Sequence, residues 1–146
     1  MTGVRGPIRA VFFDLGSTLI HFTGSWAEVQ PASNRALVAA LLESGLRLDL
    51  PVFQAEFSRR MEAYFARRED DCLEYTTESV LRRLLADLGH PVVPAAVLQA
   101  ALARMYAISQ AHWQPEQDAL PTLRKLAGAG YRIGLISNAS DAADVH

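Results

Sequence analysis

The sequence predicts an α/β protein in which two parallel strands are separated by a block of helices. Two short apolar runs, IRAVFFDL at residues 8–15 and YRIGLIS at residues 131–137, have the length and composition of buried strands. Between them, several segments repeat apolar residues at helical spacing. Parallel strands need a crossover connection, so two strands with helices between them favour parallel pairing.

Composition limits the class of protein before any motif is considered. The 146 residues are half hydrophobic and carry 14 basic and 16 acidic side chains, which is typical of a soluble globular chain. Cys72 is the single cysteine, which excludes a disulfide framework and a cysteine zinc site. The formal charge of −2 argues against a nucleic-acid partner. Since no run approaches a membrane span of about 20 apolar residues, we expect no membrane partner and a cytoplasmic location.

The first half of the chain begins with a strand and continues with helices. The strand at residues 8–15 contains Asp14 near its end and leads into a tight turn. A helix is expected from about Ser33, with Gly45 placed to stop it. Pro51 can start the next helix, which carries an aromatic stripe and runs to about Arg68.

The second half repeats the helical pattern before the last strand. Helices are expected over residues 77–88 and from Pro94, and residues 112–117 are interpreted as a connector. A short helix over residues 120–129 then precedes the strand at residues 131–137. The block between the strands is far longer than one crossover needs. We therefore predict a partial α/β core at residues 1–20 and 113–146, with a helical domain inserted at residues 21–112.

Two polar side chains follow the predicted strands. Asp14 ends the first strand and Ser137 ends the second, and ligands of parallel α/β sheets gather at the carboxyl ends of strands. A carboxylate at this edge can act as a nucleophile or hold a cation, and a hydroxyl can hydrogen-bond a phosphoryl oxygen. From spacing alone, a turn or capping role for Asp14 is equally open.

The residues themselves narrow this choice, because VFFDLGSTL followed by GLISNAS resembles the haloacid dehalogenase-like hydrolase superfamily. In that family a strand ends in Asp-x-Asp-Gly-Thr-Leu, and its first Asp forms a covalent aspartyl intermediate. Asp14 matches this nucleophile, Thr18 matches the end of the motif, and Ser137 with Asn138 matches the second motif. The helical block resembles the family's cap inserted after the first strand, and the strands resemble its Rossmann-like sheet, incomplete here.

The resemblance implies Mg²⁺-dependent hydrolysis of a small phosphorylated substrate. Asp14 would attack phosphorus, and Ser137, Asn138 and Thr18 with the loop amides from Leu15 to Ser17 would hold the phosphoryl oxygens. The cation would be held by Asp14 and by the backbone carbonyl of Gly16.

Departures from the family pattern put activity in doubt. Gly16 stands where phosphatase members carry a second Asp, the general acid and base, whose help is typically about 10² to 10⁴ in rate. Ser17 replaces the usual Gly. The family's later basic and acidic motifs cannot be assigned: Lys125 is the single lysine and precedes the second strand. His21 and Trp26 follow the first motif; either could contact substrate, and His21 could replace the missing acid, although packing or surface roles are the simpler interpretation.

Since a two-stranded sheet is a poor independent fold, we expect this chain to be the amino-terminal part of a longer protein and inactive by itself. A shortened natural protein, or chain complementation in a dimer, are alternatives. A catalytically silent binding or regulatory protein remains the alternative from another class. Haloacid dehalogenation is also open, although dehalogenases carry an aromatic residue at the place of Gly16. Carbon–phosphorus cleavage is disfavoured because it needs a cap lysine.

Overall fold

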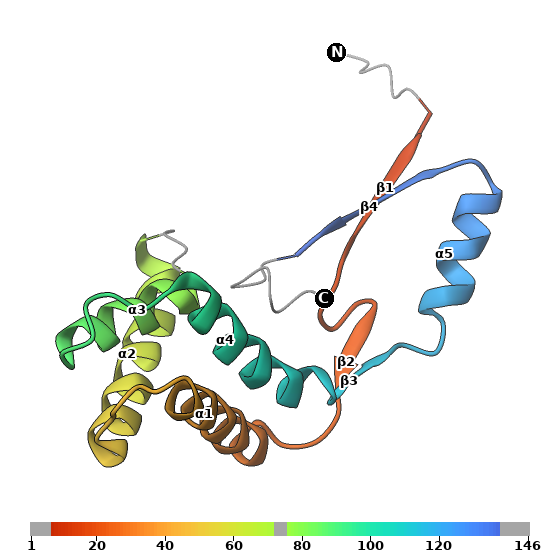
Figure 1. Ribbon diagram of the computed structural model, residues 1–146. Coiled ribbons are helices and arrows are strands. Elements are labelled where there is room, and N and C mark those ends of the chain that lie inside the picture. Colours follow the sequence, from red (N-terminus) through yellow and green to blue (C-terminus); the bar gives the residue numbers. More distant parts are fainter. Residues whose placement is uncertain (1–6, 72–75, 138–146) are drawn as a thin grey trace. The chain divides into compact units, whose positions relative to one another are not determined.

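The computed structural model describes residues 7–71 and 76–137 of the chain. Its contacts divide the described chain into two compact units. We call residues 7–24 and 112–137 the strand unit, and residues 25–111 the helical unit. The elements follow in the order β1 (Ala10–Asp14), β2 (Ile20–Phe22), α1 (Trp26–Glu43), α2 (Leu50–Asp71), α3 (Thr77–Asp87), α4 (Ala95–Gln110), β3 (Trp113–Pro115), α5 (Ala119–Gly128) and β4 (Arg132–Ile136) (Figure 1).

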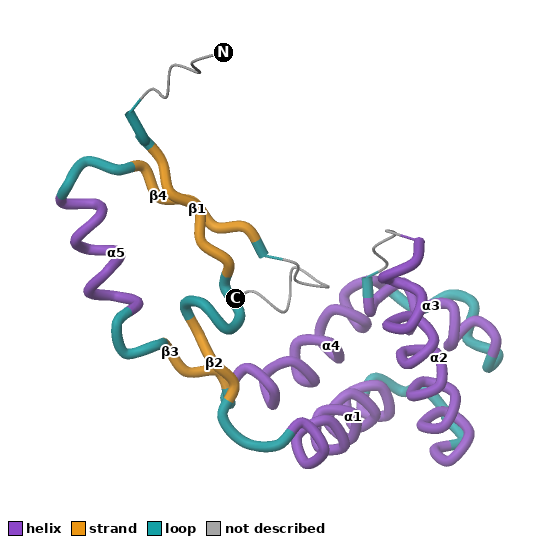
Figure 2. Tube along the Cα trace, turned by 180° about the vertical axis from the view of Figure 1, so that it is seen from behind, coloured by secondary structure: helices purple, strands orange, loops and turns teal. Residues whose placement is uncertain are grey.

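The two apolar runs form a parallel pair, which confirms the predicted α/β class. β1 pairs with β4 in a register that begins with Ala10 opposite Arg132 and ends with Asp14 opposite Ile136 (Figure 2). Both strands therefore finish at the same edge. The register places the last residue of β1 beside the last residue of β4, as the sequence predicted for the carboxyl ends.

A second, antiparallel pair was not predicted. β2 pairs with β3, with His21 opposite Gln114 and Phe22 opposite Trp113 (Figure 2). The interpretation of residues 112–117 as a connector alone was therefore wrong. These strands have only three residues each, and their sequences carry no alternating pattern long enough to identify them.

The prediction that both apolar runs are buried strands was also wrong for the described chain. Phe12 is 65% exposed, Leu135 is 50% exposed and Ile136 is 65% exposed. In the described residues the parallel sheet has two strands, so large apolar side chains on them have few neighbours that could cover them.

Three hydrogen bonds join Thr23 and His112 in the strand unit, and we call this contact the Thr23–His112 clasp. The amide and hydroxyl of Thr23 both donate to the carbonyl of His112, at 2.7 and 2.8 Å. His112 Nδ1 lies 2.9 Å from the carbonyl oxygen of Thr23 and must carry the proton there, since a carbonyl only accepts. The clasp joins the two places where the chain passes between the strand unit and the residues of the helical unit.

The helical unit has a continuous core. α1 lies alongside α4, and α2 and α3 pack beside each other (Figure 1). The fully enclosed side chains are mostly leucines from several helices, which is the outcome that apolar repeats at helical spacing predict. They are Leu37, Leu41, Phe53, Leu81, Leu84, Leu85, Leu98 and Leu102.

Helix α1 begins earlier than predicted. It starts at Trp26 rather than near Ser33, and it contains Pro31. Proline lacks an amide hydrogen and favours the first turn of helices, so its presence obscured the helical pattern of this segment. Val29 and Ser33 are buried, which shows that the first turns contribute to packing as well.

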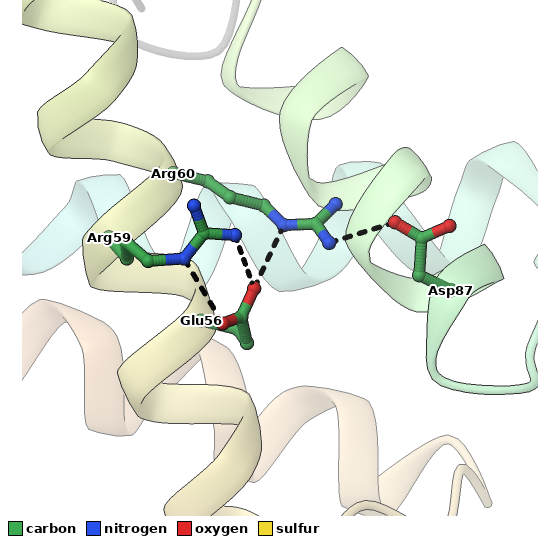
Figure 3. Close-up of polar contacts among 4 residues, drawn as sticks. All are labelled: Glu56, Arg59, Arg60 and Asp87. Carbon is green, nitrogen blue, oxygen red and sulfur yellow. Dashed lines mark hydrogen bonds and ion pairs between the residues drawn. The ribbon is translucent and has the colours of Figure 1, made fainter.

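Polar contacts join helices across the surface of the helical unit. Arg60 lies between Glu56 of its own helix and Asp87 of α3, with Arg60 Nη2 at 2.8 Å from Asp87 Oδ2 (Figure 3). Inside the unit, the hydroxyl of Tyr106 donates to Thr77 Oγ1 at 2.8 Å. Of the helices that the structure describes, none combines the length and apolar character needed to span a bilayer.

Candidate functional site

The carboxyl ends of β1 and β4 form one side of an open pocket. The pocket has a volume of about 440 Å³ and is lined by Phe12, Phe13, Asp14, Ile136 and Ser137. The structure thus brings the two polar residues that follow the predicted strands, Asp14 and Ser137, to one cavity. A volume of this order falls within the range of small-ligand pockets.

The turn after Asp14 is organised around one carbonyl. The Leu15 carbonyl accepts from the amides of Leu19 at 2.9 Å and Ile20 at 3.1 Å, and more distantly from that of Thr18. Oδ1 of Asp14 accepts from the amide of Leu15 at 2.8 Å. This last bond restrains the Asp14 carboxylate where β1 ends, while the side chain remains exposed to solvent.

Ser17 adopts a left-handed backbone conformation in this turn. Its φ is 60°, in the region that glycine adopts without strain, and its amide donates to the carbonyl of Ile20 at 2.7 Å. The departure noted at this position therefore places a serine where the backbone favours a glycine. The amides of Leu15 and Ser17 both donate within the turn, whereas none of these turn bonds uses the amide of Gly16.

The space beside Gly16 is bordered by an aromatic ring. A Cβ built on Gly16 would lie 3.8 Å from Cη2 of Trp113, an ordinary van der Waals distance. Trp113 is in β3, and its ring also packs edge-on against Phe22 with 5.4 Å between ring centroids. The residue at which a second Asp was expected from the family pattern therefore faces carbon atoms of an indole.

His21 is paired with an acid on the other face of the β2–β3 ribbon. His21 Nδ1 lies 3.2 Å from Glu116 Oε1. The two atoms are at ion-pair distance, but they do not form a hydrogen bond. The nitrogen is shielded from solvent and has no hydrogen-bond partner among the described residues. Neighbouring residues in a strand point to opposite faces, so His21 lies opposite the face that Phe22 shares with Trp113.

The remaining predicted site residues are placed as follows. Thr18 is an exposed residue of the turn, and Trp26 begins α1 in the helical unit. Asn138 lies outside the described residues, as do the acids Asp141 and Asp144. Lys125 lies in α5, ahead of β4, as expected from its place in the sequence.

Candidate metal ligands in this region are few. Among the side chains that the structure describes, no three of His, Cys, Asp or Glu cluster closely enough to hold a metal ion. Of the side chains that line the pocket, Asp14 is the one that offers a carboxylate, an oxygen ligand that suits a hard cation.

Comparison with known proteins decides the family. The model of the haloacid dehalogenase-like hydrolases, described as a hydrolase family, matches residues 8–145 of this chain. The chain belongs to the haloacid dehalogenase-like hydrolase family. The chain is accordingly a member of a hydrolase family whose proteins generally use Mg²⁺. No curated protein matches it.

Two features of this hydrolase's site were not found from the sequence. Trp113 was assigned to a connector, and Glu116 was not singled out. Both depend on the pairing of β2 with β3, since this pairing places Trp113 against Phe22 and the amide of Glu116 against the Leu19 carbonyl. A Trp followed by Gln-Pro-Glu carries no local signal for a strand that contains only three residues.

Proposed function

We propose that the protein hydrolyses phosphoric esters of small molecules through an aspartyl-phosphate intermediate on Asp14. The observation that carries this proposal is the pocket at the carboxyl ends of β1 and β4, which is lined by Asp14 and Ser137. A carboxylate at such an edge can attack phosphorus, and a hydroxyl can hydrogen-bond an oxygen of the transferred group.

In this mechanism Asp14 would act as the nucleophile. One carboxylate oxygen attacks phosphorus in line, and the bond that Oδ1 accepts from the Leu15 amide restrains the orientation of the carboxylate. The hydroxyl of Ser137 and the Gly16 amide are the donors that we assign to the phosphoryl oxygens. Water then attacks the aspartyl phosphate and releases phosphate, which restores the carboxylate.

Mg²⁺ fits this site through oxygen donors. The cation commonly binds one or two carboxylates together with substrate phosphate and waters. Asp14 and the Gly16 carbonyl are the groups that would hold it. Gly16 and Ile20 form an isolated β-bridge, and its hydrogen bonds use the Leu15 and Ile20 carbonyls, not the Gly16 carbonyl. When bound, the cation neutralises charge that would otherwise repel a phosphate dianion from Asp14.

The test compares Asp14→Asn with the unchanged protein, both expressed from the whole open reading frame. We expect hydrolysis of phosphate esters with Mg²⁺ to fall by at least about 10³-fold in Asp14→Asn, because an amide is not a nucleophile for phosphorus. Mass spectrometry of the unchanged protein quenched during turnover should find a phosphoryl group on the peptide containing Asp14. Equal activity of the two proteins would show that the assigned mechanism is wrong.

A second candidate is hydrolysis of a carbon–halogen bond, and the position of Trp113 favours it. Dehalogenases of this family carry an aromatic residue at the place of Gly16, and here Trp113 brings an aromatic ring beside that position from β3. Asp14-dependent release of halide from 2-haloacids, without release of phosphate from esters, would select this candidate. If no substrate panel yields Asp14-dependent turnover, a catalytically silent binding protein becomes the better explanation.

A further inference from the structure

We propose that the site accepts phosphoryl donors whose leaving oxygen departs without being protonated, such as acyl and aryl phosphates. The inference rests on the proposed function, because it concerns the same nucleophile, Asp14. Three features of the strand unit carry it: the glycine at position 16, the indole that borders it, and the orientation of the one histidine in β2.

Position 16, two residues after Asp14, has no side chain that could donate a proton. A general acid must lie within hydrogen-bond reach of the leaving oxygen, directly or through one water. Gly16 has no side chain, and the side-chain atom nearest to a Cβ built on it is a carbon of Trp113, 3.8 Å away. Of the five residues that line the pocket, Asp14 is the single acid or base, and it is occupied as the nucleophile.

His21 lies on the other face of the β2–β3 ribbon from the indole that borders Gly16. Its Nδ1 is shielded and faces Glu116 at 3.2 Å. Its strand neighbour Phe22 points to the face that carries Trp113, so the imidazole belongs to the opposite face of the ribbon. The Trp113 ring that borders Gly16 therefore lies on the far side of the ribbon from His21.

The consequence for chemistry follows from the balance of the first step. A carboxylate oxygen of Asp14 forms a bond to phosphorus, the bond from phosphorus to the leaving oxygen breaks, and that oxygen departs with the electron pair. None of the described residues that line the pocket is left to donate a proton to it, so it departs as an anion. Carboxylic acids ionise with a pKa near 4 and phenols near 10, whereas alkyl alcohols lie close to water at about 15.7. Departure from an alkyl ester is therefore strongly disfavoured.

The second step restores the enzyme without a base at position 16. Water attacks phosphorus of the aspartyl phosphate, the bond between Asp14 and phosphorus breaks, and the carboxylate is regenerated. The proton of the attacking water passes to the released phosphate. The net reaction converts a phosphate ester dianion and water into the anion of the leaving group and monobasic phosphate, so atoms and charge balance.

The experiment measures kcat/KM with Mg²⁺ across one series of donors: acetyl phosphate, nitrophenyl phosphate, phenyl phosphate and glycerol phosphate. The protein is expressed from its whole open reading frame. We expect kcat/KM to fall along this series as the pKa of the leaving group rises, with glycerol phosphate at least about 10²-fold below acetyl phosphate.

Two substitutions at one position provide matched variants. Gly16→Asp adds the carboxyl group, and Gly16→Asn adds a side chain of the same shape that cannot act as an acid of comparable strength. Gly16 does not have a positive φ, and a Cβ built on it would lie at an ordinary van der Waals distance of 3.8 Å from Trp113, so the backbone accepts a residue with a Cβ at this position. Gly16→Asp should raise the ratio of kcat/KM for glycerol phosphate to kcat/KM for acetyl phosphate by about 10²-fold or more, whereas Gly16→Asn should not raise this ratio.

The outcomes separate this inference from the proposed function. A steep dependence on leaving-group pKa that Gly16→Asp flattens supports the inference. Asp14-dependent turnover that is equally fast for acetyl phosphate and glycerol phosphate overturns it and leaves the proposed function standing. If neither turnover nor phosphorylation of Asp14 occurs with any donor, the proposed function fails and this inference fails with it.

Discussion

The two units of this hydrolase differ in how they treat their apolar side chains. Leu81, Leu84 and Leu85 of the helical unit are fully enclosed, whereas Phe12 and Ile136 at the candidate site are 65% exposed. Burial of apolar surface is the main favourable term in folding. In the described chain, packing therefore stabilises the helical unit far more than the parallel strands that carry Asp14. The candidate chemistry lies in the less well packed unit.

The largest effect that this comparison predicts is in the helical core. Leu85→Ala should lower the free energy of unfolding of the helical unit by about 2–5 kcal/mol, because it removes a side chain with 0% exposure and leaves a cavity. Urea denaturation followed by far-ultraviolet circular dichroism measures the change.

Leu42→Ala is the matched control, because it makes the same chemical deletion in α1 at a side chain that is 39% exposed. It should change stability by no more than about 0.5 kcal/mol. Equal losses in the two variants would contradict the assignment of the core to the enclosed leucines.

A smaller effect of reversible sign is expected in the strand unit. A Cβ on Gly134 would lie 2.5 Å from Cε1 of Phe12, the residue opposite it in the register, so Gly134→Ala must displace this ring. Because the ring is largely exposed and can move, we expect the free energy of unfolding to fall by about 1 kcal/mol, which is the lower end of the usual cost of overpacking. Hydrogen exchange of the β1 and β4 amides measures the stability of this pair.

The same substitution should be favourable once the ring is removed. In the Phe12→Ala background the Cβ fits, and replacing a strand glycine by alanine then gains roughly 0.5–1 kcal/mol by reducing backbone entropy in the unfolded chain. If Gly134→Ala has the same sign in both backgrounds, the contact between the Phe12 ring and Gly134 does not control the pair.

The smallest effect concerns the charged surface of the helical unit. Hydrogen bonds and the charge of Arg104, which reaches Glu43 from α4, hold the pKa of the Glu43 carboxyl below its ordinary value of 4.5. A carboxyl whose pKa is lowered by folding stabilises the folded state above its unfolded pKa. This contribution is lost as the pH falls below about 4.5 and through the lowered pKa.

Glu43→Gln tests this point with a neutral side chain of similar shape. Between pH 6 and pH 3, the Tm of the unchanged protein should fall more than the Tm of Glu43→Gln, and the difference should shrink in high salt. Because the pair is exposed, the difference is expected to be small. A steeper fall in Glu43→Gln would contradict the direction assigned to the pKa shift.

Local patterns in the sequence determined much of this molecule. The α/β class, the two apolar strands, their parallel pairing and most helices could be predicted, because short continuous apolar runs favour strands and apolar residues at a spacing of three or four favour helices. The placement of Asp14 and Ser137 at one edge followed from the same logic, since parallel strands that end in polar residues deliver them to one side of the sheet.

Tertiary structure alone decided what surrounds these residues. β2 and β3 are each three residues long, and they are held together by hydrogen bonds between segments far apart in the chain, which no local periodicity encodes. That pairing brings Trp113 beside Gly16 and His21 beside Glu116. The sequence thus determined that Asp14 and Ser137 lie at one edge of the sheet, whereas the long-range pairing of two short strands decided what lies beside the turn after Asp14, because contacts between distant segments depend on the whole fold.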